Sequence, residues 1–249
     1  MKYCRKKMMS WRWMLFAAIA IASSGVQARG VSKSDAPANA ATAQVSKETE
    51  RILNSIKTTQ YKHDTQIDEK KGVYLCDCSG FVGYVLKQTV AKDDPKKGPL
   101  GDGNGRPTAS QFEKAFAKAP TKADGSSRWQ HVVRLADARP GDVIAWRHEK
   151  PMPGNTGHVV FVAERPVLES DGLVKVVIVD STTKPMVDDT RAAGTSGIGR
   201  CTMWFTIDDE GRPHAHIRGS RKATPKVESI SIGRALPAAK KLSAGRRAA

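Results

Sequence analysis

The stretch YLCDCSGFVGYVLKQ at residues 74–88 decides the fold, because it places a reactive side chain where an amphipathic helix begins. Asp77 precedes Cys78 and belongs to the residue types that cap helix N-termini. Apolar side chains then recur at helical spacing at Phe81, Val82, Val85 and Leu86. We therefore predict a helix that starts at Cys78, with the thiol beside the unpaired N–H groups of the first turn.

Two further helices are predicted around this one. Ser46 can cap a helix that runs to about Thr58 and carries an apolar face. Thr108 and Gln111 fit a capping box that opens a second, shorter helix. The apolar face of this shorter helix consists of Phe112, Ala115 and Phe116.

The second half of the chain predicts strands. Apolar or alternating runs lie at 129–135, 143–146, 157–163, 174–179, 201–207 and 214–218. The run at 174–179 leads directly into Asp180. Turn residues separate several of them, at 139–142 and at 209–211. Helices followed by a series of antiparallel strands predict an α+β fold.

Length and composition predict one catalytic domain. The chain has 249 residues, of which 39% are hydrophobic, enough for one packed core. We divide it into a signal peptide at 1–28, a flexible leader at 29–45, a domain at 46–235 and a basic disordered tail at 236–249. Within the domain, residues 91–130 form an insertion of loop and helix.

The N-terminus predicts export to the periplasm or the extracellular space. Five Lys or Arg residues precede an apolar run at 15–22, and small residues follow at Val26 and Ala28. The apolar run is short for a membrane span, so we expect none after cleavage, although an uncleaved signal anchor is the alternative. Removing residues 1–28 takes away five of the 16 net positive charges and leaves +11. This charge suits an anionic envelope polymer, whereas no aromatic-basic pattern favours nucleic acid.

Cysteine usage predicts a free thiol. Cys4 is removed with the signal, which leaves Cys76, Cys78 and Cys201, an odd number for an exported protein. A disulfide between Cys76 and Cys201 would leave Cys78 as the free one.

Two polar residues at strand ends could complete a nucleophilic site with Cys78. His158 opens the apolar run at 157–163, and Asp180 follows the next one. If these strands pair as a hairpin, the carboxylate can orient the imidazole and the imidazole can take the thiol proton. The alternatives are a buried structural cysteine, a core histidine and a turn aspartate. His131 and His148 are other candidate bases, and His214 with His216 could form a metal pair.

Three blocks in this order resemble the NlpC-type cell-wall peptidase family. They are Asp77-Cys78-Ser79-Gly80-Phe81-Val82, Arg139-Pro140-Gly141-Asp142-Val143 and Gly157-His158-Val159-Val160-Phe161-Val162. The resemblance covers about residues 46–185. It implies a papain-like fold and cleavage of amide bonds in peptidoglycan stem peptides, often between D-Glu and a diamino acid. The position of the family's third polar residue is Asp180, where histidine is usual.

The chain also departs from this pattern. The insertion before the His158 strand is long, and the family's upstream tyrosine has only Tyr61 and Tyr74 as candidates. Residues 186–235 have no counterpart; they include the motifs DDTR at 188–191 and GIGR at 197–200.

We therefore predict an exported cysteine hydrolase in which Cys78 attacks, His158 is the base and Asp180 orients it. Backbone N–H groups near Cys78 and Ser79 would bind the oxyanion. Candidate substrate contacts are Asp77, Ser79 and Tyr74. The mechanism requires no metal or organic cofactor. The alternatives are an acyl hydrolase or acyltransferase with another substrate, and a non-catalytic envelope-binding module.

Overall fold

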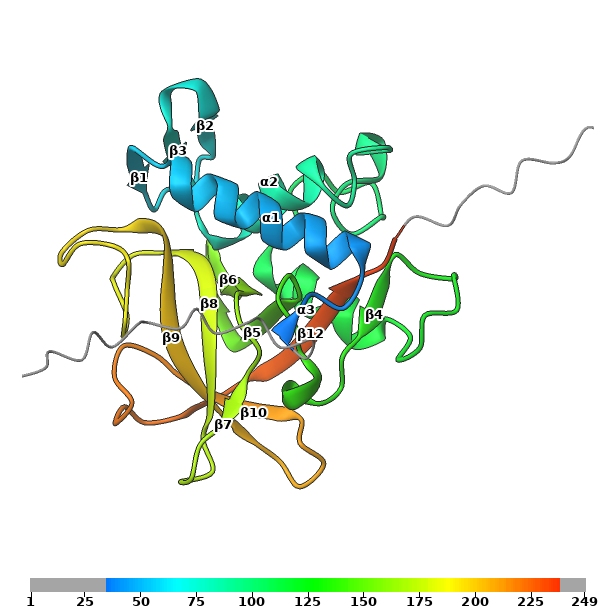
Figure 1. The fold of residues 1–249 in the computed structure, drawn as a ribbon, viewed down its shortest axis with the longest axis vertical. Helices are drawn as coiled ribbons and strands as arrows, with labels where there is room; N and C mark the ends of the chain where they lie inside the picture. Colours follow the sequence, from blue (N-terminus) through cyan, green and yellow to red (C-terminus); the bar gives the residue numbers. More distant parts are fainter. Residues whose placement is uncertain (1–34, 238–249) are drawn as a thin grey trace, which may run out of the picture. The chain divides into compact units, whose positions relative to one another are not determined.

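A computed structural model describes residues 35–237 of the chain as an α+β domain (Figure 1). The predicted signal peptide and residues 238–249 of the predicted tail lie outside the described residues. In the described part, no helix combines the length and apolar character that crossing a membrane requires.

The first helix, α1 (Ala40–Ser55), begins earlier than the sequence analysis predicted. Asn39 caps it, because its side chain accepts hydrogen bonds from the N–H groups of Ala41 and Thr42, and Thr42 completes a capping box. The prediction that residues 29–45 form a flexible leader is therefore wrong from residue 40 onward. Ser46 lies inside the helix rather than at its start.

The other two α-helices confirm their predicted starts. Helix α2 spans Cys78–Gln88 with Asp77 as its N-cap, and α3 spans Ala109–Lys118 with a capping box between Thr108 and Gln111. Three short 3-10 helices lie in the connections: η2 (Glu69–Lys71), η3 (Pro95–Lys97) and η4 (Leu135–Asp137). The α2 start fixes where Cys78 stands relative to the strands.

A small sheet that the sequence analysis did not predict leads into α2. It contains β1 (Thr58–Gln60), β2 (Gln66–Asp68) and β3 (Val73–Leu75) in the order β1-β3-β2. Strand β1 runs parallel to β3, and β2 runs antiparallel to it. Each strand is only three residues long, and β1 and β2 are mostly polar, so the strands are too short to show an apolar period in the sequence.

The large sheet has nine strands, eight of them in the order β11-β10-β9-β8-β6-β5-β12-β4, with β7 paired to β8. Their bounds are β4 (Trp129–His131), β5 (Val143–Met152), β6 (Asn155–Val162), β7 (Val167–Leu168), β8 (Val174–Thr182), β9 (Gly197–Ile207), β10 (Pro213–Ile217), β11 (Lys226–Val227) and β12 (Ser229–Ala235). All six predicted strands exist, and every pairing in this sheet is antiparallel. The run at 129–135 ends sooner than predicted, since η4 follows β4.

Strands β6 and β8 are antiparallel neighbours, as the hairpin hypothesis required. Phe161 pairs with Val179, and this register brings the start of β6 toward the end of β8. Asp180 lies inside β8, two residues before its end, rather than at the end of the strand as predicted.

Side chains on the two faces of the large sheet enter two separate cores. One face of β6, with Val159 and Phe161, packs against α2 and α3, and Phe81 of α2 meets Phe161 edge to face at 5.7 Å. The other face carries Trp146, Val160 and Val162, together with residues of β8 and β9. Figure 1 shows α1 and α2 lying beyond the ends of β8 and β9, next to the small sheet. The helices thus cover one face only.

The predicted turn before β5 is confirmed and joins α1 to the sheet. Gly141 has φ 87°, and a Cβ there would lie 2.1 Å from the carbonyl oxygen of Thr42. The buried Asp142 accepts two hydrogen bonds from Arg234 of β12. Only glycine fits this backbone at such close approach.

The proposed disulfide between Cys76 and Cys201 is wrong. Both cysteines are free and buried, as is Cys78. Cys76 belongs to the core on the helix side of the sheet, whereas Cys201 belongs to the core on the opposite face. The sheet backbone separates the two sulfur atoms.

Candidate active site

Cys78 is the first residue of α2, and the helix start is built by its neighbour Asp77. The carboxylate Oδ1 of Asp77 accepts the N–H of Gly80 at 2.7 Å. The N–H groups of Cys78 and Ser79 have no hydrogen-bond partner among residues 35–237. These two free donors beside the sulfur are what an oxyanion needs, and that role stays a prediction. Gly80 has no Cβ, and the side chain of Thr65 occupies the space that a Cβ would need.

Two contacts place Cys78 against β6 and β8. The backbone N–H of Val159 stands close enough to the sulfur to favour its ionised form. The hydroxyl of Ser181 donates a hydrogen bond of 2.6 Å to the carbonyl oxygen of Cys76. Val159 directly follows His158, and Ser181 directly follows Asp180. The start of α2 therefore lies beside the parts of β6 and β8 that carry the two candidate partners of the thiol.

His158 and Asp180 form a buried pair. Nε2 of His158 lies 2.7 Å from Oδ2 of Asp180, and their side chains are 7% and 0% exposed. An ionised carboxylate accepts only, so Nε2 carries the proton and Nδ1 is the basic nitrogen. Nδ1 has no hydrogen-bond partner in the described part of the chain.

The thiol belongs to the core on the helix side of β6, the imidazole packs on Trp146 of the opposite core, and no hydrogen bond joins the two among the described residues. The imidazole lies on the face of Trp146, whose ring centroid is 5.1 Å from its own. The sulfur lies beside the peptide that joins His158 to Val159. Catalytic hydrogen bonds are often long before substrate binds, so this arrangement is compatible with proton transfer.

Electrostatics favour a neutral pair in the resting site. Burial, and then the charge of Asp77, raise the pKa of the Cys78 thiol to about 12. Burial and the charge of Arg218 lower the pKa of His158, against the opposing effect of Asp180. The helix start therefore does not by itself produce a thiolate, and deprotonation of Cys78 requires the imidazole as a base.

Asp180 stays ionised although it is fully buried. Burial alone would raise its pKa, but the hydrogen bond with His158 and the charges of Arg191 and Arg218 lower it. The pair is thus a neutral imidazole held by a carboxylate, which is the arrangement that orients a general base.

A second group of polar side chains surrounds the cap of α2. Arg106, from the insertion, donates to Oδ1 of Asp77 at 2.9 Å and to the hydroxyl of Ser79 at 2.7 Å. Nδ1 of His63 lies 3.3 Å from Oδ2 of Asp77. Asp77 and Ser79 are 7% and 6% exposed. Both predicted substrate contacts therefore stabilise the helix start, and Arg106, which sequence reasoning missed, holds them.

Tyr74 is a wrong prediction as a substrate contact. Its side chain is fully buried in the helix-side core, and its hydroxyl lies 2.9 Å from that of Ser55. Tyr61 lies nearer the site and is half-buried; burial and then the charge of Cys78 raise its pKa. Of the two candidate tyrosines, Tyr61 is the one beside the thiol.

Arg218 is a further residue that the sequence did not single out. Its guanidinium donates to the hydroxyl of Thr182 at 2.9 Å and lies 3.9 Å from Oδ2 of Asp180. It also covers the ring of Trp146 at 5.8 Å. It follows β10, far from β8 in sequence, so only the sheet order brings it to the site.

The other candidate histidines lie elsewhere. His131 pairs with β12, and His148 lies 2.7 Å from Glu228. His216 is buried against Trp146 at 4.5 Å, while a bulge between Pro213 and Ala215 interrupts the face that the prediction gave to His214 and His216. Within residues 35–237 no group of three or more His, Cys, Asp or Glu side chains is arranged to hold a metal.

Two hollows on the surface do not contain the site. One of about 480 Å³ lies between α1, β1 and the loop before β9, and one of about 220 Å³ lies beside β10 and β12. Neither is lined by Cys78 or His158.

The chain matches no protein-family profile, no curated protein and no solved structure. The chemistry of the site therefore rests on its own residues.

Proposed function

We propose that the protein is an exported cysteine hydrolase that cleaves amide bonds in peptidoglycan stem peptides. Cys78 is the nucleophile, His158 the general base and Asp180 the residue that orients the base. One observation carries this proposal: the Asp180 carboxylate holds Nε2 of His158 at 2.7 Å and leaves Nδ1 without a partner among residues 35–237, while the N–H of the next residue, Val159, lies beside the Cys78 thiol.

The proposed reaction is acyl transfer to water. The Cys78 proton moves to Nδ1 of His158 while the sulfur attacks the amide carbonyl carbon, and the free N–H groups at 78 and 79 bind the oxyanion. The C–N bond breaks and the amine leaves with the imidazolium proton. Water then attacks the thioester and gives a proton to His158. The C–S bond breaks, a carboxylic acid is released, and His158 returns that proton to the sulfur of Cys78. No metal or organic cofactor enters these steps.

The papain-like architecture belongs to this proposal. A cysteine at the start of a helix packs on an antiparallel strand that carries the histidine, and the neighbouring strand carries the third polar residue. Arg139-Pro140-Gly141-Asp142 builds the turn that starts β5, next to β6. Two of the three blocks that resemble the NlpC-type family therefore carry Cys78 and His158, and the third forms a turn that is hydrogen-bonded to Val162, at the other end of β6 from His158.

The substrate class is supported by charge and by the resemblance. The net charge of +11 after signal removal favours an anionic polymer of the cell envelope. Export would bring the enzyme to that polymer. The insertion that carries Arg106 lies beside the thiol, so its residues border the path of an incoming peptide.

The test is digestion of purified peptidoglycan with product masses read out. The wild-type chain should release stem-peptide fragments, Cys78→Ala should release none, and His158→Ala should be slower by at least about 10²-fold. Cys76→Ala is the matched control, because it removes a buried thiol two residues away and should keep activity. Turnover of another acyl substrate, with peptidoglycan intact, would assign the same chemistry to a different substrate.

Thiol labelling separates catalysis from a binding module. Iodoacetamide should alkylate Cys78 of the wild type faster than that of His158→Ala, with fragment ions distinguishing Cys78 from Cys76 in their shared peptide. Equal rates would remove His158 as the base and favour a non-catalytic envelope-binding domain.

A further inference from the structure

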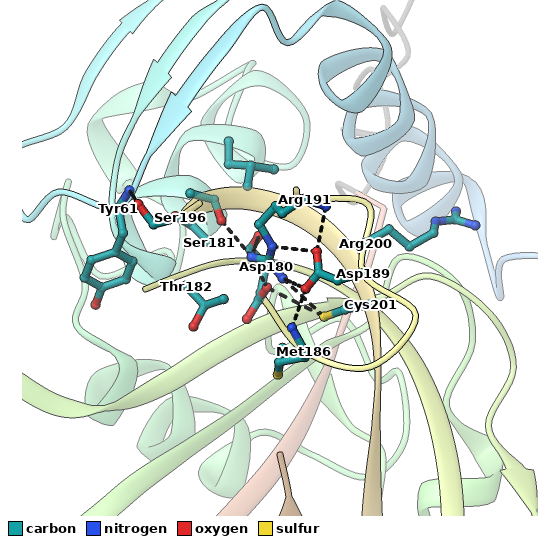
Figure 2. Close-up of polar contacts among 12 residues, drawn as sticks. Tyr61, Asp180, Ser181, Thr182, Met186, Asp189, Arg191, Ser196, Arg200 and Cys201 are labelled. Carbon is teal, nitrogen blue, oxygen red and sulfur yellow. Dashed lines mark hydrogen bonds and ion pairs between the residues drawn. The ribbon is translucent and has the colours of Figure 1, made fainter. Parts of the chain in front are cut away.

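The loop between β8 and β9 contains one of the two motifs that found no role in the sequence analysis, DDTR at 188–191. Its arginine, Arg191, points back toward Asp180 (Figure 2). NH1 of Arg191 donates to Oδ1 of Asp180 at 3.0 Å and to the carbonyl oxygen of Gly197 at 2.7 Å. The loop thus returns a cation to the carboxylate that holds His158.

Arg191 is itself held rigidly. Asp189 accepts two hydrogen bonds from its guanidinium, at 2.8 and 2.7 Å, and the side chains of the two residues are 2% and 3% exposed. Asp188, before them, is the one non-glycine residue within 35–237 with a positive φ, 49°, and its carboxylate accepts the hydroxyl of Thr202. A strained and fully bonded loop of this kind persists when the surrounding structure over-determines it.

The second motif, GIGR at 197–200, makes room for the guanidinium group and its stem. A Cβ on Gly199 would lie 2.6 Å from Nε of Arg191 and 2.7 Å from its Cγ. These atoms cannot easily move away, because both ends of the side chain are bonded. The two motifs together therefore form one holder for Arg191.

The two oxygens of Asp180 have separate partners. Oδ1 accepts from Arg191, and Oδ2 accepts from Nε2 of His158. A carboxylate fixed at one oxygen cannot rotate freely at the other, so Arg191 determines where Oδ2 stands.

We propose that Arg191 is a positioning residue: through Asp180 it holds His158 in the tautomer that carries its proton on Nε2 and presents a bare Nδ1 to Cys78. This inference rests on the proposed function, because the tautomer matters for catalysis only when His158 acts as the base for Cys78. It assigns the DDTR and GIGR motifs to the base side of the site.

The charged and titratable groups that face His158 come from several elements: Asp180 of β8, Arg191 of the following loop, and Arg218 and His216 of the β10 region. Arg191 and Arg218 both oppose protonation of the imidazole, and Asp180 favours it. Loss of Arg191 would leave Arg218, whose guanidinium lies 3.9 Å from Oδ2, as the arginine still beside Asp180. With one opposing cation removed, the negative charge of Asp180 would stabilise the protonated imidazole more strongly, and the pKa of His158 would rise.

The experiment uses histidine ¹⁵N chemical shifts of the full chain across pH, with assignment by His158→Gln. Four variants weaken the contacts of Arg191 in different ways. Gly199→Ala displaces the guanidinium without changing its charge, and Arg191→Lys keeps only the charge. Asp189→Asn weakens the ion pair that holds the guanidinium, and Arg191→Met removes the guanidinium. Arg200→Met is the matched control, since Arg200 binds Glu50 and Glu164 at the surface.

The wild type and Arg200→Met should show the Nε2–H tautomer. Gly199→Ala and Arg191→Met should show a tautomer mixture, and Arg191→Met should also titrate at higher pH. The same variants should shrink the rate difference in Cys78 alkylation that His158→Ala produces. If Arg191→Met does not fold, the milder variants carry the same tautomer readout.

An unchanged tautomer in every folded variant, with alkylation still dependent on His158, would overturn the role of Arg191 and leave the proposed function intact. Alkylation that ignores His158 in the wild type would instead overturn the proposed function, and with it the use of the tautomer.

Discussion

Two aspartates flank the candidate site, and each is bound by an arginine, but the two pairs differ in burial. Asp77 binds Arg106, whose side chain is 43% exposed, while Asp180 binds Arg191, whose side chain is 2% exposed. Both arginines lie outside the blocks that resemble the peptidase family. One pair stabilises the start of the nucleophile helix, and the other stands behind the base.

The difference shows that the same two residue types act differently in the two places. An ion pair with one well-exposed partner is partly screened by water, so the exposed partner can be lost at small cost. A buried pair has already lost its hydration, so removing one partner leaves an unpaired charge in a medium that stabilises it poorly. We therefore expect the buried pair to control folding and the imidazole, and the exposed pair to control the thiol.

The largest expected effect comes from breaking the buried pair. Arg191→Met should lower the free energy of unfolding by about 3–5 kcal/mol, because Asp180 and Asp189 lose their shared cation. Urea unfolding followed by circular dichroism measures this, with Arg200→Met as the control. A loss below about 1 kcal/mol would mean that the two pairs do not differ as their burial suggests.

The next largest expected effect is a loss of stability in acid, caused by the buried side chain of His216. Burial lowers the pKa of His216 to about 4, so the unfolded chain binds this proton at higher pH than the folded one. Stability is therefore complete above about pH 6.5 and falls as pH drops toward 4, by about 3 kcal/mol from this residue. Urea unfolding at several pH values measures the slope.

His216→Phe sharpens this acid prediction. Phenylalanine keeps the stacking on Trp146 and cannot titrate, so the decline between pH 6.5 and 4 should become shallower. Should the variant show the wild-type slope, the acid sensitivity would belong to another group.

Breaking the exposed pair should change stability little. Arg106→Ala is expected to lower the free energy of unfolding by less than about 1 kcal/mol, since water replaces the lost contact. The same variant should slow alkylation of Cys78, because the Asp77 charge beside the thiol is then less compensated. Faster alkylation would contradict the assignment of Arg106 to the thiol side.

Asp77→Asn should have the smallest effect on stability and an opposite effect on reactivity. Asparagine caps helices about as well as aspartate, so the free energy of unfolding should stay within about 0.5 kcal/mol. Removing the negative charge should lower the pKa of Cys78 and speed its alkylation at fixed pH. The pH dependence of alkylation in the two variants, measured side by side, should diverge in these directions.

Local pattern predicted most of the elements. The starts of α2 and α3 follow from capping residues, and the strands β4, β5, β6, β8, β9 and β10 follow from periodicity and turns. The pairing of β6 with β8 was a hypothesis, and the structure confirms it. The start of α1 was placed too late, because the cap is Asn39 and polar residues follow it. The small sheet was missed, because strands of three residues are too short to show a period.

The sequence by itself determined the Cys78 helix start, the α+β class, and the prediction of His158 and Asp180 as partners. These depend on residues close to one another along the chain and on the alternation of a strand. Only the tertiary structure decided that Arg106 binds Asp77 and that Arg191 and Arg218 lie beside Asp180. It likewise decided that Tyr74 is buried and that Cys76 cannot reach Cys201. Those facts depend on sheet order and on burial, which bring together residues that no local pattern connects.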